Sequence, residues 1–297
     1  MTKPRICVVT GGDSKYFHQI QACIDSLHKW FSPIDYDLKV IGIDLSAQDL
    51  AWLDARARTC PRMGNLSIEI LTDVSSFPKN PTAPNYVVSL TCRPFLRETF
   101  PGYEAYLWVD SDIRFLAPDG LQYWLTNSLD PSTTLAIAHQ NEPSYFFNTD
   151  ADQARGQGLF YFNRILRSYG PDTAEYLRYF KMHNAGIWGA RADSPIWRRY
   201  RRNFEKKMAA DPNDWFEQEA INVALVEVGG IRDVPTIYNW MALYSIPLRT
   251  SDGSWVSPME PTRKISVIHL VLSANQCLIP GNPGTMYEYY KKIGLTA

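Results

Sequence analysis

The chain has 297 residues, enough to bury a large core in one domain or two. Its 30 basic and 31 acidic residues nearly cancel, so the net charge gives no reason to expect a nucleic-acid partner. No apolar run approaches about 18 residues and the N-terminus leads straight into a short apolar run, so we expect no membrane span, no signal peptide and a cytoplasmic location. The cysteines are odd in number and mostly lie in apolar runs, which predicts reduced core thiols: Cys7, Cys23, Cys60, Cys92 and Cys277.

Strand-like and helix-like patterns alternate in the first third of the chain. The strands are predicted at 6–10, 37–43, 67–71 and 105–109, and the helices at 16–31, 47–57 and 86–99. Pro94 lies in the first half of the last of these helices, and three prolines within 72–85 predict a loop. Such alternation with short connections predicts a mostly parallel sheet with right-handed crossovers.

The second half of the chain is less regular. The predicted elements are an apolar run at 134–139, an irregular polar and aromatic stretch at 141–158, helices at 173–181, 195–208 and 216–226, and strands at 184–190 and 265–272. No repeat or low-complexity linker divides the sequence, so we expect one continuous α/β domain over 1–297.

Two basic segments raise the question of membrane contact. Between Arg198 and Lys207, basic side chains alternate with aromatic ones at helical spacing, which favours an amphipathic helix with a solvated basic face over a patch resting on anionic lipid. The segment 287–292 carries Tyr287, Tyr289 and Tyr290 followed by two lysines, and such an end either docks on its own domain or faces a membrane. A peripheral contact with the inner face of a membrane is therefore kept as an alternative.

Two aspartates follow the apolar run 105–109, at the carboxyl end of a predicted strand, where open α/β sheets hold their ligands. Residues two apart on a strand point to the same side, with Cα atoms roughly 7 Å apart, so Asp110 and Asp112 can share one cation. Left bare, the two charges would repel by on the order of 3 kcal/mol at an effective dielectric of about 20. The alternative is that both are solvated turn residues.

His269 ends another short apolar run, far along the chain. Taken alone, it is most simply a buried structural histidine. Beside Asp110 and Asp112 it would complete a set of two carboxylates and one imidazole, which suits Mn²⁺ better than Mg²⁺ and leaves positions open for a diphosphate.

These motifs together resemble the GT-A-fold nucleotide-sugar glycosyltransferases, most closely glycosyltransferase family 8, whose members transfer galactose or glucose with retention of configuration. The family's Asp-x-Asp, which binds Mn²⁺ and the donor diphosphate, is similar to Asp110-Ser111-Asp112. The family also has an arginine that opens a Leu- and Pro-rich helix about 16 residues upstream, and Arg93 lies near that offset.

The resemblance continues downstream. The family's Phe-Asn-Ala-Gly-Val strand resembles 183–188 (HNAGIW), which implies that Asn184 touches the donor sugar. Its Asp-Gln-Asp-x-Leu-Asn helix start resembles 217–222 (EQEAIN), which implies that Glu217 holds the sugar and Gln218 lies near the anomeric carbon. The family's late histidine ligand matches His269.

By the same resemblance, the chain divides into a nucleotide-binding half, 1–112, and a sugar and acceptor half, 113–297, which includes the late metal-ligand strand. Thr10, Gly11 and Asp13, at the end of the first strand, would face the nucleoside. The implied architecture is a GT-A fold with a Rossmann-like sheet flanked by helices, although the glycine fingerprint G-x-G-x-x-G is missing.

One departure from the family is clear. The family continues its histidine as His-x-x-Gly-x-x-Lys, whereas Leu272 and Asn275 stand at the glycine and lysine positions here. The family's lysine contact to the leaving diphosphate is therefore missing at that position.

Each of these residues also has a plain interpretation. Asn184 could cap a strand end, and Glu217 could lie on a solvated first turn of a helix. The glycines at 11 and 12 could form only a tight turn, and Arg93 could pair with Glu98 at the surface.

The expected function is transfer of a hexose from a UDP-sugar to a hydroxyl of a carbohydrate, lipid-linked or other acceptor, by same-face displacement with Mn²⁺. Retention is implied by the resemblance alone. One alternative is a non-catalytic nucleotide-sugar-binding protein, suggested by the residues missing after His269. Another is a haloacid-dehalogenase-type phosphatase, although those enzymes carry Asp-x-Asp on the first strand and three predicted strands precede it here.

Overall fold

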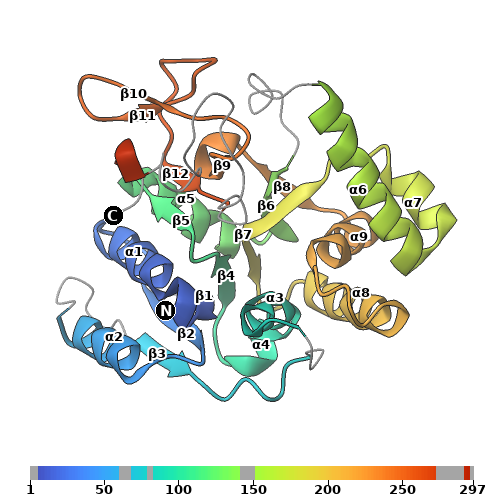
Figure 1. Ribbon diagram of the computed structural model, residues 1–297, viewed down its shortest axis with the longest axis horizontal. Coiled ribbons are helices and arrows are strands. Elements are labelled where there is room, and N and C mark those ends of the chain that lie inside the picture. Colours follow the sequence, from blue (N-terminus) through green and yellow to red (C-terminus); the bar gives the residue numbers. More distant parts are fainter. Residues whose placement is uncertain (1–5, 60–67, 79–82, 141–150, 272–290, 295–297) are drawn as a thin grey trace.

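The computed structural model describes residues 6–59, 68–78, 83–140, 151–271 and 291–294 (Figure 1). Its strands are β1 (Ile6–Asp13), β2 (Tyr36–Ile43), β3 (Ile68–Leu71), β4 (Ala105–Val109), β5 (Ile113–Phe115), β6 (Leu135–His139), β7 (His183–Arg191), β8 (Ile231–Val234), β9 (Trp240–Met241), β10 (Leu248–Arg249), β11 (Trp255–Val256) and β12 (Val267–His269). Its α-helices are α1 (Phe17–His28), α2 (Ala47–Thr59), α3 (Val88–Thr91), α4 (Leu96–Thr99), α5 (Pro118–Leu129), α6 (Ala151–Tyr169), α7 (Pro171–Leu177), α8 (Ile196–Ala210) and α9 (Gln218–Val228).

Within the described residues, a seven-stranded sheet with the order β3-β2-β1-β4-β7-β6-β8 forms the centre of the molecule. Neighbouring strands are parallel except at β7, which runs antiparallel to both β4 and β6. The predicted mostly parallel sheet is confirmed. Because β7 is reversed, its first residues lie at the edge of the sheet where β4 and β6 end.

Helices cover both faces of this sheet, and the alternation of side chains along β1 assigns them (Figure 1). Ile6 and Val8 pack with α1, α2 and α5 in one buried cluster. Cys7 and Val9 pack with α3, α4, α8 and α9 in the other. The core is therefore two apolar layers separated by the sheet, as in doubly wound folds.

A small second sheet positions the late part of the chain. Strand β12 pairs with β5 in antiparallel orientation and with β9 in parallel orientation. In this register His269 lies opposite Ile113, directly beside Asp112. A separate hairpin pairs β10 with β11. The central sheet takes strands from both 1–112 and 113–297, which favours one domain. The single-domain assignment itself stays a prediction.

The prediction of one helix over 86–99 is wrong. The segment forms four short turns, namely the 3₁₀ turns Asn85–Val87 and Arg93–Phe95 together with α3 and α4. Pro94 explains the break, because it has no backbone N–H and its ring clashes with the preceding turn.

Other sequence-based expectations are partly corrected. The part of the irregular stretch that is described, 151–158, belongs to α6, while 141–150 lies outside the described residues. Helix α5, which begins at Pro118, was not predicted. Helix α8 has the expected exposed basic face, but Lys207 is buried and ion-paired with Asp214 and Glu219.

The cysteines that the structure describes, Cys7, Cys23 and Cys92, are buried free thiols as predicted; Cys60 and Cys277 lie outside the described residues. The tyrosines of 287–290 lie outside them as well. None of the helices in the described ranges combines the length and the apolar character that crossing a bilayer requires.

His28, at the end of α1, gives a pH-dependent contribution to stability. Burial, with a smaller effect of the Arg56 charge, lowers the pKa of His28 from 6.5 to about 4. The unfolded chain therefore binds this proton more readily, so we expect up to about 3 kcal/mol of unfolding free energy to be lost as the pH falls from 6.5 to 4. Urea unfolding of the native chain and of His28→Gln between pH 6.5 and 4 measures this loss. If the unfolding free energy of both proteins falls equally steeply with pH, the effect does not come from His28.

Candidate functional site

Two carboxylates and one imidazole converge at the carboxyl end of β4. Asp110 and Asp112 lie in the turn between β4 and β5, and the carbonyl of Asp112 accepts a hydrogen bond from the Leu270 amide at 3.1 Å, which fixes β12 beside the turn. The Nε2 atom of His269 lies 3.3 Å from Asp112 Oδ1 and 3.9 Å from Asp110 Oδ2. One ligand atom from each residue lies within 4.8 Å of the others. The structure thus brings together the three residues predicted to bind metal.

The two oxygens of Asp110 have different surroundings. Oδ1 accepts hydrogen bonds from Arg93 Nη2 at 2.5 Å and from Trp108 Nε1 at 2.7 Å. Oδ2 faces His269 instead. This outer shell of donors holds the carboxylate in one orientation, as partners of metal ligands commonly do. The donor set of carboxylate oxygens and one imidazole nitrogen suits a divalent ion such as Mn²⁺.

The electrostatics of this cluster favour a cation. Burial raises the pKa of Asp110 and the charge of Asp112 raises it further, while Arg93 opposes both. Burial lowers the pKa of His269, but the neighbouring Asp112 and Asp110 more than compensate, so its pKa lies above the usual range. A proton on His269 therefore offsets part of the negative charge, and a divalent cation would offset more.

Arg93 is a buried clamp and has no surface pair with Glu98. Its Nη1 donates to Glu217 Oε1 at 2.5 Å and to the Ala185 carbonyl at 3.0 Å, and its Nε donates to the Ser89 carbonyl at 3.1 Å. The guanidinium also lies over the Trp108 ring, 4.7 Å from its centroid. Glu98 pairs with Arg97 instead.

Glu217, Gln218 and Glu219 are also buried, so the interpretation of Glu217 as part of a solvated helix turn is wrong. Burial raises the pKa of Glu217, and the adjacent Arg93 charge opposes that rise. Arg93 therefore joins the end of β4 to the start of α9 through two carboxylates.

A network of amide side chains lies beside the acidic cluster. Gln140 Oε1 accepts hydrogen bonds from Gln218 Nε2 at 2.6 Å and from Asn184 Nδ2 at 3.3 Å. Asn184 Oδ1 accepts from the Gly186 amide at 3.0 Å and from Asn239 Nδ2 at 3.2 Å. Asn184 and Gln218, predicted from separate motifs, thus share one partner.

This network contains residues that the sequence did not single out. Gln218 Nε2 also donates to the Tyr161 hydroxyl at 2.9 Å, and Gln140 Nε2 donates to the Tyr244 hydroxyl at 2.8 Å. The sequence offered one signal for these residues, namely that Gln140 directly follows the apolar run 134–139. No pattern in the sequence pointed to Asn239 or Tyr161.

Gly186 separates the amide network from the acidic cluster. A Cβ atom there would lie 2.3 Å from His269 Cε1 and 2.8 Å from Asn184 Oδ1. Real Cβ atoms do not approach that closely, so only glycine lets β7 and His269 pack as they do.

The predicted nucleoside-facing residues lie at the end of β1. A Cβ on Gly11 would lie 3.0 Å from the Ile41 carbonyl, and one on Gly12 would lie 3.7 Å from Ser111 Oγ, which places this strand end beside the Asp-x-Asp turn. Thr10 is buried, and Asp13 accepts a hydrogen bond from the Tyr16 amide at 3.2 Å. Their contact with a nucleotide stays a prediction. Leu272 and Asn275 lie outside the described residues.

Replacing Arg93 by methionine should destabilise the fold strongly. The change leaves Asp110 and Glu217 buried without their cation, which typically costs about 3 to 5 kcal/mol. Arg97→Met is the matched control, because Arg97 is exposed and pairs only at the surface, so its loss should change the unfolding free energy by less than about 1 kcal/mol. Urea unfolding measures both; equal losses would refute the clamp.

Gly186→Ala should displace His269 from Asp112. Away from that carboxylate, the pKa of His269 should fall, and NMR titration of the imidazole measures the change. Gly12→Ala is the control, since the nearest atom to its Cβ would belong to the flexible Ile20 side chain, at 3.3 Å, and Ser111 Oγ would lie at an ordinary contact distance of 3.7 Å. An unchanged titration of His269 in Gly186→Ala would contradict the packing argument.

Neither a protein-family model nor a curated protein matches the sequence. Solved structures do match. The bifunctional glycosyltransferase WbbM is 17% identical, with a TM-score of 0.60 over 91% of this chain, which spans 46% of WbbM. The galactosyltransferase LgtC, in complex with donor and acceptor sugar analogs, is 17% identical, with a TM-score of 0.57 over 98% of this chain and 96% of LgtC. An LgtC active-site mutant with glutamate in place of glutamine is 16% identical, with a TM-score of 0.56 over 97% of this chain and 95% of the mutant. The chain has the GT-A fold of these glycosyltransferases.

Proposed function

We propose that this protein transfers a hexosyl group, glucose or galactose, from a UDP-sugar to a hydroxyl acceptor. The observation that carries the proposal is the convergence of Asp110, Asp112 and His269 at the carboxyl edge of a GT-A sheet. Asp110, Ser111 and Asp112 would also meet the donor diphosphate, and Thr10, Gly11 and Asp13 its nucleoside.

Asp110, Asp112 and His269 would hold Mn²⁺, with Mg²⁺ as a second choice. When bound, the ion supplies positive charge for the departing diphosphate. The residues of this chain prepare that position: Arg93 and Trp108 hold one oxygen of Asp110, and β12 holds His269 next to Asp112.

The amide network would bind the sugar. Asn184 and Glu217 would contact hexose hydroxyls, and Gln218 would lie at the anomeric carbon. A neutral amide at that position is a poor nucleophile, so attack by the acceptor on the face that the diphosphate leaves is favoured over a stable glycosyl-enzyme. Replacement of an active-site glutamine in LgtC is consistent with such a role for Gln218.

The acceptor would approach from α6 and α7. A cavity of about 680 Å³ lies there, and Tyr161, which bonds to Gln218, lines it together with Phe162, Ile165, Leu177 and Met182. This lining suits an acceptor whose hydroxyl-bearing sugar carries an apolar group, such as a lipid-linked one. Carbohydrates and other hydroxyl compounds remain in the acceptor panel.

UDP release from UDP-glucose and UDP-galactose with Mn²⁺ tests the proposal. We expect turnover that EDTA removes, a roughly hundredfold or larger loss in Asp112→Asn, and little change in Asp193→Asn, an exposed carboxylate at the far end of β7. NMR of the product shows whether the anomeric configuration is retained.

Two other outcomes would contradict the proposal. Binding of UDP without any turnover across donors and acceptors would make the chain a nucleotide-sugar-binding protein. Release of phosphate from simple phosphoesters, with no use of a nucleotide sugar, would indicate a phosphatase.

A further inference from the structure

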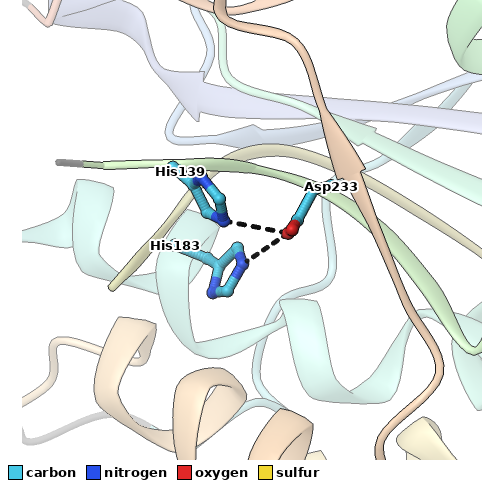
Figure 2. Close-up of side chains that lie close together, drawn as sticks. All are labelled: His139, His183 and Asp233. Atoms are coloured by element: carbon cyan, nitrogen blue, oxygen red, sulfur yellow. Dashed lines mark hydrogen bonds and ion pairs between the residues drawn. The ribbon is translucent and has the colours of Figure 1, made fainter. Parts of the chain in front are cut away.

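A second cluster of metal-ligating side chains lies along the same edge of the sheet, outside the acidic site. His139 ends β6, His183 begins β7 and Asp233 lies in β8, so three adjacent strands contribute one residue each. Figure 2 shows both imidazoles turned toward the carboxylate. The Nε2 atoms of His139 and His183 lie 2.9 Å and 3.2 Å from the same oxygen, Asp233 Oδ1.

The strand register builds this cluster. His139 pairs with His183 across β6 and β7, and Ile137, two residues earlier on the same face, pairs with Asp233. The pairing of β6 with β7 is interrupted between Ile137 and Ala138, where the register shifts. Irregularities of this kind often re-aim side chains next to functional sites.

Asn222 places a hydrogen-bond acceptor beside the Nδ1 atom of His183. Its Nδ2 donates to the carbonyls of His183 and Gln218, at 3.0 Å and 2.8 Å, so its Oδ1 must be the acceptor atom. That oxygen accepts from the His183 amide at 2.8 Å and lies 3.4 Å from His183 Nδ1. When Nε2 of His183 binds a metal ion, the hydrogen of the neutral imidazole is on Nδ1, where Asn222 Oδ1 is the available acceptor.

His183 Nε2 and Asp233 Oδ1 lie 3.2 Å apart, so they are joined either by a hydrogen on Nε2 or by a metal ion that both atoms bind. Tetrahedral Zn²⁺ with bonds of about 2.0 to 2.2 Å places its ligand atoms about 3.3 to 3.6 Å apart. The two nitrogen-to-oxygen spacings, 2.9 Å and 3.2 Å, need to widen by only a few tenths of an ångström, and the exposed Asp233 side chain is able to move.

We propose that His139, His183 and Asp233 bind one transition-metal ion of the Zn²⁺ class, with the fourth position open to water or an exogenous ligand. Two imidazoles and one carboxylate form a more nitrogen-rich set than Asp110, Asp112 and His269, so this site should prefer Zn²⁺ or Co²⁺ over Mn²⁺. This second metal site is separate from the glycosyl transfer proposed above and does not depend on that function.

The position of the site indicates what the ion would do. Gln140 directly follows His139, Asn184 directly follows His183, and these two amides bond to each other. An ion joining β6, β7 and β8 would therefore hold the strand ends that carry the amide network. It would raise the stability of the fold and fix the geometry of that network.

Titration of the metal-free 297-residue chain with Co²⁺ tests the site, because four-coordinate Co²⁺ absorbs visible light far more strongly than six-coordinate Co²⁺. We expect one strongly absorbing Co²⁺ per chain, displaced by Zn²⁺, and a rise in the thermal unfolding temperature on adding Zn²⁺. Asp233→Asn and His139→Gln should each weaken binding at least about tenfold. Asp233 is exposed and the change to Asn is isosteric, so this variant should fold.

Two controls separate this site from its surroundings. Asp112→Asn alters the first cluster and Asp193→Asn removes an exposed carboxylate elsewhere, and both should keep the strong absorption. If the native protein gives no such band, or if Asp233→Asn and His139→Gln bind Co²⁺ like the native chain, the cluster is only hydrogen-bonded and the proposal fails. Loss of the band in Asp112→Asn would likewise overturn it, by assigning the ion to the first cluster.

Discussion

The site depends on one buried cation. The guanidinium of Arg93 is shared by Asp110 and Glu217, which reach it from β4 and from the turn before α9, far apart in the sequence. Burying three charges is favourable only when each is compensated and hydrogen-bonded, and Arg93 uses three of its nitrogens to achieve this. Because the guanidinium occupies one oxygen of Asp110, the other is directed toward His269. Arg93 thus determines how the carboxylate of Asp110 is presented to His269.

The reversed strand β7 explains why the remaining groups gather at the same place. Had β7 been parallel, its first residues would lie at the opposite edge of the sheet from Asp110. Its reversal brings Asn184 and the strand start to the carboxyl edge, and Gly186 lets His269 approach the strand from the second sheet. The acidic cluster and the amide network therefore lie next to each other, on either side of Gly186. This arrangement suits a ligand that combines a charged group with a hydroxylated one.

Local chemistry in the sequence was sufficient to predict the strand ends and the residues that follow them. Asp110 and Asp112 follow an apolar run, so their position at the carboxyl edge could be anticipated from the topology of a parallel sheet. His269 lies on β12 in the second sheet, and only the family resemblance assigned it to the two aspartates. The amides of Gln140 and Asn239 could not be, because their roles arise from contacts across 44 and 55 positions of sequence. The break at Pro94 follows from the clash of the proline ring with the preceding turn. The apolar periodicity of 86–99 had suggested an unbroken helix. The helix over 151–158 was missed because this segment contains two glycines and no apolar residue larger than alanine, so it shows no apolar periodicity.

One edge of the sheet therefore presents two ligand sets of different chemistry. Where β4 meets the second sheet, carboxylates dominate and favour a hard cation that can share its shell with phosphate oxygens. Where β6, β7 and β8 end, imidazoles dominate and favour an ion that binds nitrogen. The amides between them are joined to both sets through β7, since Asn184 lies between His183 and Gly186. Because β7 carries both His183 and Gly186, a displacement of the start of this strand would move both ligand sets.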